Sequence, residues 1–71
     1  MYVRILLREV REAHHLSIKQ LSHRSGVAAS QISRIENGWS NPTIRCLCKL
    51  ADAMNVPVDA LYVHHRGDPI L

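Results

Sequence analysis

Histidine, cysteine and aspartate side chains are the residues of this 71-residue chain that are best suited to bind a metal ion or to act in catalysis. The candidates are His14, His15, His23, Cys46, Asp52, His64 and His65. Their spacings match neither the C-x-x-C nor the H-x-x-x-H patterns of zinc sites. A chain this small also offers no water-excluding pocket for a Ser/His or Cys/His pair. We therefore expect no metal site, no cofactor and no enzymatic activity.

A different chemistry is suggested by residues 26–38, GVAASQISRIENG, which include several small residues and carry one positive charge, at Arg34. At 100° per residue, Ile32 and Ile35 mark the buried face of a helix, and the polar residues fall on the opposite face. Small side chains let a helix approach base edges closely in the major groove, and an arginine can donate two hydrogen bonds to guanine. This pattern favours a DNA-reading surface.

The composition of the chain is compatible with a DNA partner. The formal net charge is +3, the isoelectric point is about 9.3, and 46% of the residues are hydrophobic, which suits one small domain with its own core. No apolar run approaches the roughly 18 residues of a membrane span, and the N-terminal YVRILL is too short for a signal peptide. Cys46 and Cys48 are poorly placed for a disulfide, and we expect Cys48 in the core and Cys46 partly exposed. These features predict a cytoplasmic, soluble protein without a membrane partner.

The apolar periodicity is helical throughout, with no sustained strand-like alternation, and it predicts a compact all-α domain. We expect five helices, at residues 3–14, 17–25, 29–36, from Asn41-Pro42 to about 54, and 58–62. Local signals support the middle ones: a capping box S-I-K-Q from Ser17, and turn residues at Gly26. His15 and Asn55 suit left-handed positions after helices. The domain is expected to cover residues 1–63, and residues 64–71 to form a tail, with the chain irregular from Val63 onwards.

The order of short motifs resembles the XRE family, the helix-turn-helix domains similar to the phage lambda repressor and Cro. The motifs are L-x-x-x-R (Leu7, Arg11), L-S (Leu16, Ser17), L-S-x-x-S-G-V (21–27), I-S-R-I-E-N-G (32–38), N-P-T (41–43), L-x-x-L-A (47–51) and V-P-x-D-x-L (56–61). The likeness covers about residues 4–62. It implies a five-helix fold, a helix-turn-helix motif at about residues 17–37, and a recognition helix at 29–36 in the major groove of double-stranded DNA.

The resemblance also assigns roles to residues. The base-reading positions are Ala28, Ala29, Ser30, Ser33 and Arg34. The phosphate-contacting positions are Ser17, Ile18, Asn37, Gly38, Trp39 and Ser40, with the backbone acting at Gly38 and Trp39. Arg11 and Glu36 match a pair that forms a structural salt bridge. For Trp39, a lid over the core is the alternative to a place beside the DNA backbone.

The sequence departs from the family pattern at three places. Ile18 replaces a DNA-contacting glutamine, Ser22 replaces an alanine at the helix crossing, and Ala28 replaces a capping Ser or Thr. The missing cap costs roughly 1 kcal/mol, and Gln31 is expected to reach back to the free amides in its place.

The functional prediction is a small, repressor-like transcriptional regulator that binds an inverted repeat as a homodimer, with no small-molecule ligand. The expected dimer contacts are Leu61, Tyr62, Val63, Ile70 and Leu71. The alternative is a protein-interaction module, antitoxin-like or accessory, that kept the fold and has weak or no DNA binding.

Overall fold

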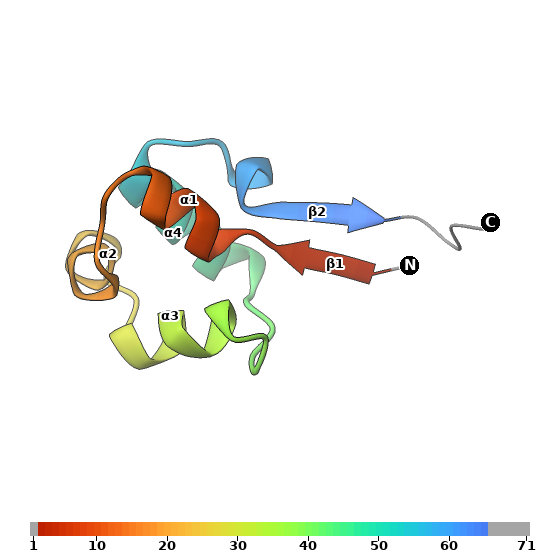
Figure 1. The fold of residues 1–71 in the computed structure, drawn as a ribbon, viewed down its shortest axis with the longest axis horizontal. Coiled ribbons are helices and arrows are strands. Elements are labelled where there is room, and N and C mark those ends of the chain that lie inside the picture. Colours follow the sequence, from red (N-terminus) through yellow and green to blue (C-terminus); the bar gives the residue numbers. More distant parts are fainter. Residues whose placement is uncertain (1, 66–71) are drawn as a thin grey trace.

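The computed structural model describes residues 2–65, which form four α-helices, one 3₁₀ helix and a two-stranded sheet (Figure 1). The elements are β1 (Tyr2–Ile5), α1 (Leu7–Ala13), α2 (Ile18–Ser25), α3 (Ala29–Glu36), α4 (Ile44–Met54), η1 (Val58–Leu61) and β2 (Tyr62–His65). The helices form a compact body, and the two strands extend from it side by side (Figure 1). The compact helical fold is thus confirmed, whereas the count of five helices and the all-α class are wrong.

The predicted first helix is wrong at its N-terminal end, where residues 2–5 form strand β1. This strand pairs antiparallel with β2, so that Val3 lies opposite His64 and Ile5 lies opposite Tyr62. Tyrosine, valine and isoleucine favour strands, but two short strands are stable only when they pair and pack against a body. The partner comes from the far end of the described chain, which local periodicity does not reveal.

The C-terminal part also differs from the prediction. The expected last helix is one 3₁₀ turn, η1, and the chain then enters β2. The expected irregular chain from Val63 is therefore wrong as far as His65, and residues 66–71 lie outside the described part. The amide of Leu6 donates to the carbonyl of Leu61 at 2.8 Å, which ties the start of α1 to the end of η1.

Helix α4 begins at Ile44, two residues after Pro42, so the predicted start at Asn41-Pro42 is wrong. The reason is the next residue: Thr43 has extended backbone angles, and its hydroxyl accepts a hydrogen bond from the amide of Cys46 at 3.0 Å. Thr43 is thus the cap. The helix ends as expected at Asn55, which is left-handed with φ 57°, the same φ as His15 after α1.

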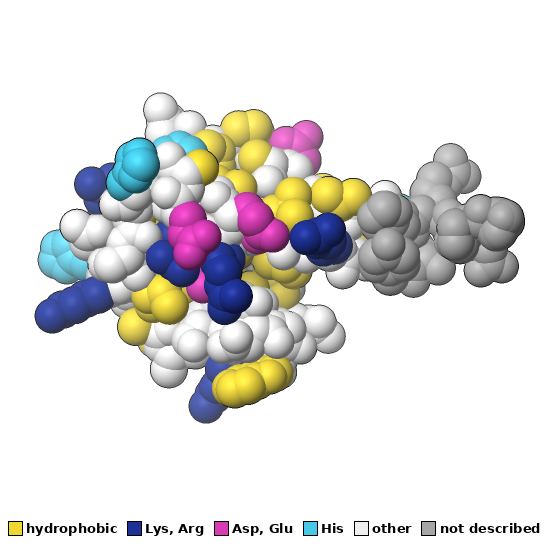
Figure 2. Space-filling view, in the orientation of Figure 1, with side chains coloured by type: hydrophobic (Ala, Val, Ile, Leu, Met, Phe, Trp, Pro, Cys, Tyr) yellow, Lys and Arg dark blue, Asp and Glu magenta, His cyan; other side chains and the backbone are white. Residues whose placement is uncertain are grey.

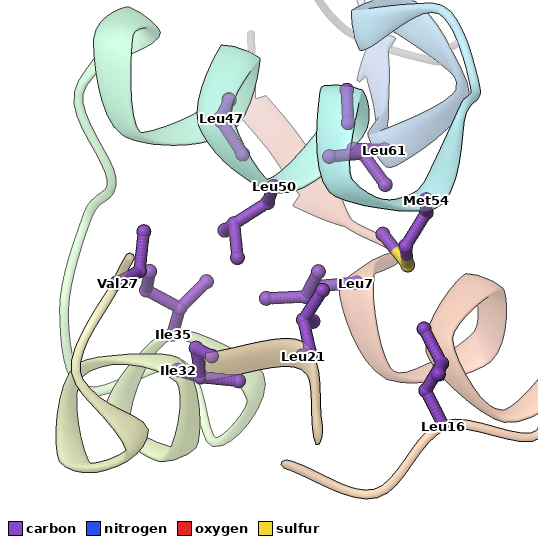
Figure 3. Close-up of a cluster of buried hydrophobic side chains, with 11 residues drawn as sticks. Leu7, Leu16, Leu21, Val27, Ile32, Ile35, Leu47, Leu50, Met54 and Leu61 are labelled. Carbon is purple, nitrogen blue, oxygen red and sulfur yellow. The ribbon is translucent and has the colours of Figure 1, made fainter. Parts of the chain in front are cut away.

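The core is built from side chains of all four α-helices and η1, with Leu16 and Val27 from the connections. Its members are Leu7, Leu16, Leu21, Val27, Ile32, Ile35, Leu47, Leu50, Ala51, Met54 and Leu61 (Figure 3). A fully buried leucine or isoleucine contributes about 1.5–3 kcal/mol. Figure 3 shows Ile32 and Ile35 of α3 directed toward Leu50 and Leu7, so this core fixes the position of α3. Leu61 is fully buried, and its expected place in a dimer interface is wrong.

An apolar groove of about 280 Å³ lies between the sheet and the start of α4. It is lined by Val3, Ile5, Asn41, Pro42, Ile44, Leu47 and Tyr62. Two of these side chains are unusually exposed for hydrophobic residues, Ile44 at 71% and Val3 at 53%. In the space-filling view, hydrophobic side chains gather where the strands leave the helical body (Figure 2). We call this feature the apolar groove.

Candidate nucleic-acid interface

Helices α2 and α3 and the turn between them are each specified by local side chains. The Ser17 hydroxyl accepts from the amide of Gln20 at 3.0 Å, and the Gln20 side chain accepts from the amide of Ser17 at 2.8 Å, which completes the predicted capping box. Gly26 ends α2 with φ 77°, a conformation that favours glycine. Val27 is then buried, and the chain turns into α3. The predicted bounds of α3, 29–36, are confirmed.

The exposed face of α3 carries the expected base-reading residues. Ile32 and Ile35 are buried at 0% and 2% exposure, as the helical projection predicted. On the other side, the structure places Ala28, Ala29, Ser30 and Arg34 in exposed positions and Ser33 in a half-buried one. The helix therefore presents two small methyl groups, two hydroxyls and one guanidinium at its surface.

The loop after α3 contradicts one of the two expectations for Trp39. Trp39 is 78% exposed, so its interpretation as a lid over the core is wrong. The amides of Gly38 and Trp39 donate within the molecule, to the carbonyls of Ile35 at 3.1 Å and Arg34 at 2.8 Å. Because an amide has one hydrogen, these two groups are already occupied. The Trp39 side chain is exposed in this loop, as are Gly38 and Asn41.

The remaining expected phosphate contacts have mixed surroundings. Ser40 is half-buried, and its hydroxyl accepts from the Gln31 side chain at 3.4 Å, so Gln31 does not reach back to the α3 amides. Ala28 accordingly provides no side-chain cap. The Ile18 side chain packs against the core, and the Ser17 amide is engaged by Gln20. Because isoleucine has no polar side-chain atom, residue 18 can contribute only its backbone amide as a donor at the start of α2.

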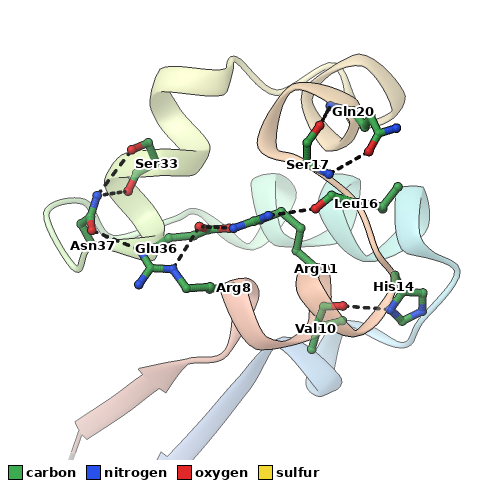
Figure 4. A network of polar contacts seen from close by, with 10 residues as sticks. All are labelled: Arg8, Val10, Arg11, His14, Leu16, Ser17, Gln20, Ser33, Glu36 and Asn37. Carbon is green, nitrogen blue, oxygen red and sulfur yellow. Dashed lines mark hydrogen bonds and ion pairs between the residues drawn. The ribbon is translucent and has the colours of Figure 1, made fainter.

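A polar network anchors the C-terminal end of α3 to α1 (Figure 4). Glu36, with 1% of its side chain exposed, pairs with Arg11 through contacts of 2.6 Å (Nε–Oε2) and 3.0 Å (Nη2–Oε1). Arg11 also donates to the carbonyl of Leu16 at 2.8 Å. The hydrogen bonds to Glu36 raise the pKa of Arg11, against the opposing effect of its burial. The structure thus contains the ion pair that the resemblance implied.

The network has two members that the sequence reasoning did not place in it. Arg8 lies 3.4 Å from Glu36 (Nε–Oε1) and donates to Asn37 Oδ1 at 3.2 Å. Asn37 in turn donates to the carbonyl of Ser33 at 2.9 Å, so its side chain is engaged within the protein. The signal was available, because residues three apart on a helix share a face and Arg8 precedes Arg11 by three.

The charge around α3 suits a polyanion. Within residues 28–40, all of which the structure describes, the one carboxylate is Glu36, which is buried and paired. Arg34 is exposed there, and Lys19 and Arg24 are exposed on α2. In Figure 2, the Asp and Glu side chains on the visible face lie over the centre and top of the molecule, whereas Lys and Arg side chains lie both beside them and at the left and lower edges, where α2 and α3 lie.

Three further observations concern metal binding, thiol chemistry and membrane crossing. Among residues 2–65, no group of three or more His, Cys, Asp or Glu side chains is placed to hold a metal ion. Cys46, and not Cys48, packs against the core, and burial raises the pKa of its thiol. None of the helices in this range has the length and apolar character needed to cross a membrane.

Comparison with known proteins finds similarity to helix-turn-helix transcriptional regulators. A sequence model of the helix-turn-helix family matches residues 7–61, from the start of α1 to the end of η1. An uncharacterized HTH-type transcriptional regulator of Mycobacterium tuberculosis is 39% identical over 57 residues, which are 80% of this chain and 41% of that protein. The HTH-type transcriptional repressor RghR of Bacillus subtilis is 45% identical over 56 residues, 78% of this chain and 42% of that protein.

A more distant relative, the HTH-type transcriptional regulator SutR of Escherichia coli, is 33% identical over 51 residues, 72% of this chain and 29% of that protein. The chain therefore spans well under half the length of these relatives. The similarity covers α2, α3 and the polar network, and strands β1 and β2 lie outside the range that the family model matches.

Proposed function

The chain belongs to the XRE-type helix-turn-helix family of DNA-binding transcriptional regulators, and from this premise we propose that it binds a specific double-stranded DNA sequence with α3 in the major groove. The observation that carries the proposal is the exposed face of α3. It combines small side chains, Arg34 and no exposed carboxylate, on a helix fixed by Ile32, Ile35 and Glu36. A helix of this kind can approach base edges without a desolvation penalty from acidic groups.

In this proposal the five surface residues of α3 have different tasks. Arg34 donates to O6 and N7 of a guanine, and the methyl groups of Ala28 and Ala29 contact thymine methyl groups. The hydroxyls of Ser30 and Ser33 donate to or accept from base edges. The phosphate contacts come from the Trp39 indole N–H, the Ser40 hydroxyl and the amide of Ile18, groups whose hydrogen-bonding capacity is not used up within the described residues.

We further propose that the protein acts as a homodimer in the cytoplasm and, like RghR by its name, as a repressor. A two-fold dimer places two copies of α3 about 34 Å apart, one turn of DNA, and so recognises an inverted repeat. The apolar groove supports self-association, because Ile44 and Val3 expose apolar surface on the chain and association would bury it. Of the originally expected contacts, Tyr62 lines this groove, whereas Val63 pairs with Arg4 and lies on the opposite face of the sheet.

Selection of bound sequences from a random DNA pool tests the proposal directly. We expect a preferred sequence with two-fold symmetry, whose affinity falls steeply as the salt concentration rises, because phosphate contacts release counterions. A protein that enriches no sequence, or binds with no salt dependence, would contradict the proposal.

The same apolar groove favours a second candidate, a protein-interaction module with little affinity for DNA. The half-buried Ile18 side chain agrees with this second candidate, because it replaces the glutamine that contacts DNA in many members of the family. The selection experiment separates the two: the module predicts no enriched sequence, although α3 is intact.

A further inference from the structure

Arg8 joins α1 to the exposed side of α3 through a chain of side chains (Figure 4). It is 49% exposed and forms a weaker contact with Glu36 than Arg11 does, 3.4 Å against 2.6 Å. Its distinctive contact is the hydrogen bond from Nη2 to Asn37 Oδ1 at 3.2 Å. Arg11 contacts Glu36 and Leu16 instead, so the two arginines have separate partners beyond their shared carboxylate.

The contact with Arg8 fixes which way the Asn37 amide points. A guanidinium only donates, so the Asn37 atom that faces it must be the carbonyl oxygen. The amide nitrogen then points toward α3, where it donates to the Ser33 carbonyl at 2.9 Å and lies 3.4 Å from the Ser33 hydroxyl. If Asn37 were free to rotate, either its oxygen or its nitrogen could face Ser33.

This orientation decides what Ser33 offers to DNA. A hydroxyl has one hydrogen to donate and can accept two. Because Asn37 donates to the hydroxyl oxygen, the hydroxyl proton remains for an acceptor outside the protein. With the Asn37 oxygen turned toward it, the same proton would be used internally.

We infer that Arg8 is a positioning residue for base recognition: through Asn37 it orients the Ser33 hydroxyl as a donor and so sets the preference at the base that Ser33 faces. The inference rests on the proposed function and goes beyond it, because it assigns a role in specificity to a residue of α1 that does not lie on the recognition helix.

The test compares Arg8→Ala with Arg4→Ala, which removes the same charge from an exposed arginine of β1 paired with Glu9 at 3.6 Å. Each variant is taken through DNA selection with the wild type. For Arg8→Ala we expect a loss of preference of about fivefold at one base position of each half-site, the effect of one hydrogen bond of ordinary strength. For Arg4→Ala we expect the base preferences to stay as in the wild type.

Coupling to Ser33 separates positioning from general damage. In a Ser33→Ala background, Arg8→Ala should no longer change the preference at that position. Arg8→Lys keeps a group that only donates hydrogen bonds, so it should retain more of the base preference than Arg8→Ala does. An Arg8→Ala effect spread evenly over all sequences, or one that persists without the Ser33 hydroxyl, would overturn the inference.

A measurement without DNA decides the structural step independently. The side-chain amide of Asn37, followed by NMR, should exchange its protons with water slowly in the wild type and in Arg4→Ala, and rapidly in Arg8→Ala. The exposed Asn55 amide serves as the internal reference. If Asn37 is unaffected in Arg8→Ala, the inference is wrong even where DNA binding is confirmed; if it responds but no DNA sequence is selected, the proposed function fails and the positioning stands.

Discussion

At Glu36, a single carboxylate with almost no exposed surface receives hydrogen bonds from two arginines of α1. A buried carboxylate without partners is costly, and a buried guanidinium is equally costly once its carboxylate is removed. The pair is therefore a strong constraint on geometry: it holds the C-terminal end of α3, where Arg34 and Ser33 lie, against α1.

Replacing this carboxylate should destabilise the fold. For Glu36→Ala we expect the free energy of unfolding to fall by about 3 kcal/mol, because Arg11, with 11% of its side chain exposed, loses its charged partner. Urea denaturation followed by circular dichroism measures the change. Glu9→Ala is the control, since it removes an exposed pair with Arg4 and should change stability little. Equal effects of the two substitutions would refute the anchoring role.

Arg34 is the one exposed cation on α3, and its substitution separates base reading from phosphate binding. We expect Arg34→Ala to weaken binding to the selected sequence by about 1–3 kcal/mol and to relax the preference at one guanine position, as for a lost bidentate contact. Competition binding with DNA sequences that differ at this guanine position measures both the loss of affinity and the change in preference. If the variant loses affinity equally for every DNA sequence, Arg34 contacts the phosphate backbone of the DNA.

At the scale of the element, α3 is held by its neighbours more than by its own ends. It has eight residues, too few for a stable isolated helix, and Ala28 supplies no cap. By contrast, α2 has a complete capping box and α4 is capped by Thr43. Helix α3 therefore owes its stability to Ile32, Ile35 and the Glu36 network.

This difference leads to a prediction at the start of α3. Ala28 has φ −59° and ψ 140°, close to the backbone angles of the capped position at Thr43, so a serine hydroxyl there can accept from a first-turn amide. We expect Ala28→Ser to add about 1 kcal/mol and to raise the melting temperature by about 4–8 °C. Thermal melting without DNA tests it, and Thr43→Ala should shift the temperature in the opposite direction. An unchanged or lower melting temperature for Ala28→Ser would contradict the argument.

How far the sequence predicts each element depends on where its determinants lie. The bounds of α2 follow from Ser17, Gln20 and Gly26, and the end of α3 follows from Asn37-Gly38; all of them act within a few residues of the helix ends they define. The strands could not be found in this way, because YVRI and YVHH are short and each becomes a strand only beside the other. For Arg8 the spacing of three from Arg11 indicated a shared helix face, but its partner Asn37, 29 residues away, could not be found from local signals.

For the whole molecule, the two strands lie outside the family core, and the apolar groove lies between them and the part of that core at the start of α4. The family model matches residues 7–61, whereas β1 and β2 flank that range. One face of β1 contributes Val3 and Ile5 to the groove. We therefore place the proposed dimer contacts on this side, at Val3, Ile44 and Tyr62, and no longer at the buried Leu61 or at Val63, which lies on the other face of the sheet.

Ile44→Asp tests the dimer without damage to the fold. Ile44 is the first residue of α4, where an acidic side chain favours the helix dipole, and it is largely exposed. We expect the wild type to show the mass of a dimer in sedimentation equilibrium and Ile44→Asp to show that of a monomer. Arg45→Asp, at an adjacent position that does not line the groove, should remain dimeric. Truncation after Val63 is a poorer test, because it removes half of β2. A wild type that is monomeric at all concentrations would exclude the dimer.

The pairing of β1 with β2 also has a consequence for the order of folding. Tyr2 and His65 lie at opposite ends of the described chain, so bringing them together requires closing a loop that contains every helix. The helix contacts between neighbouring elements require much shorter loops and can form first. The sheet is then the last part to assemble, and substitutions at Val3 or Val63 should accelerate unfolding while leaving the folding rate nearly unchanged.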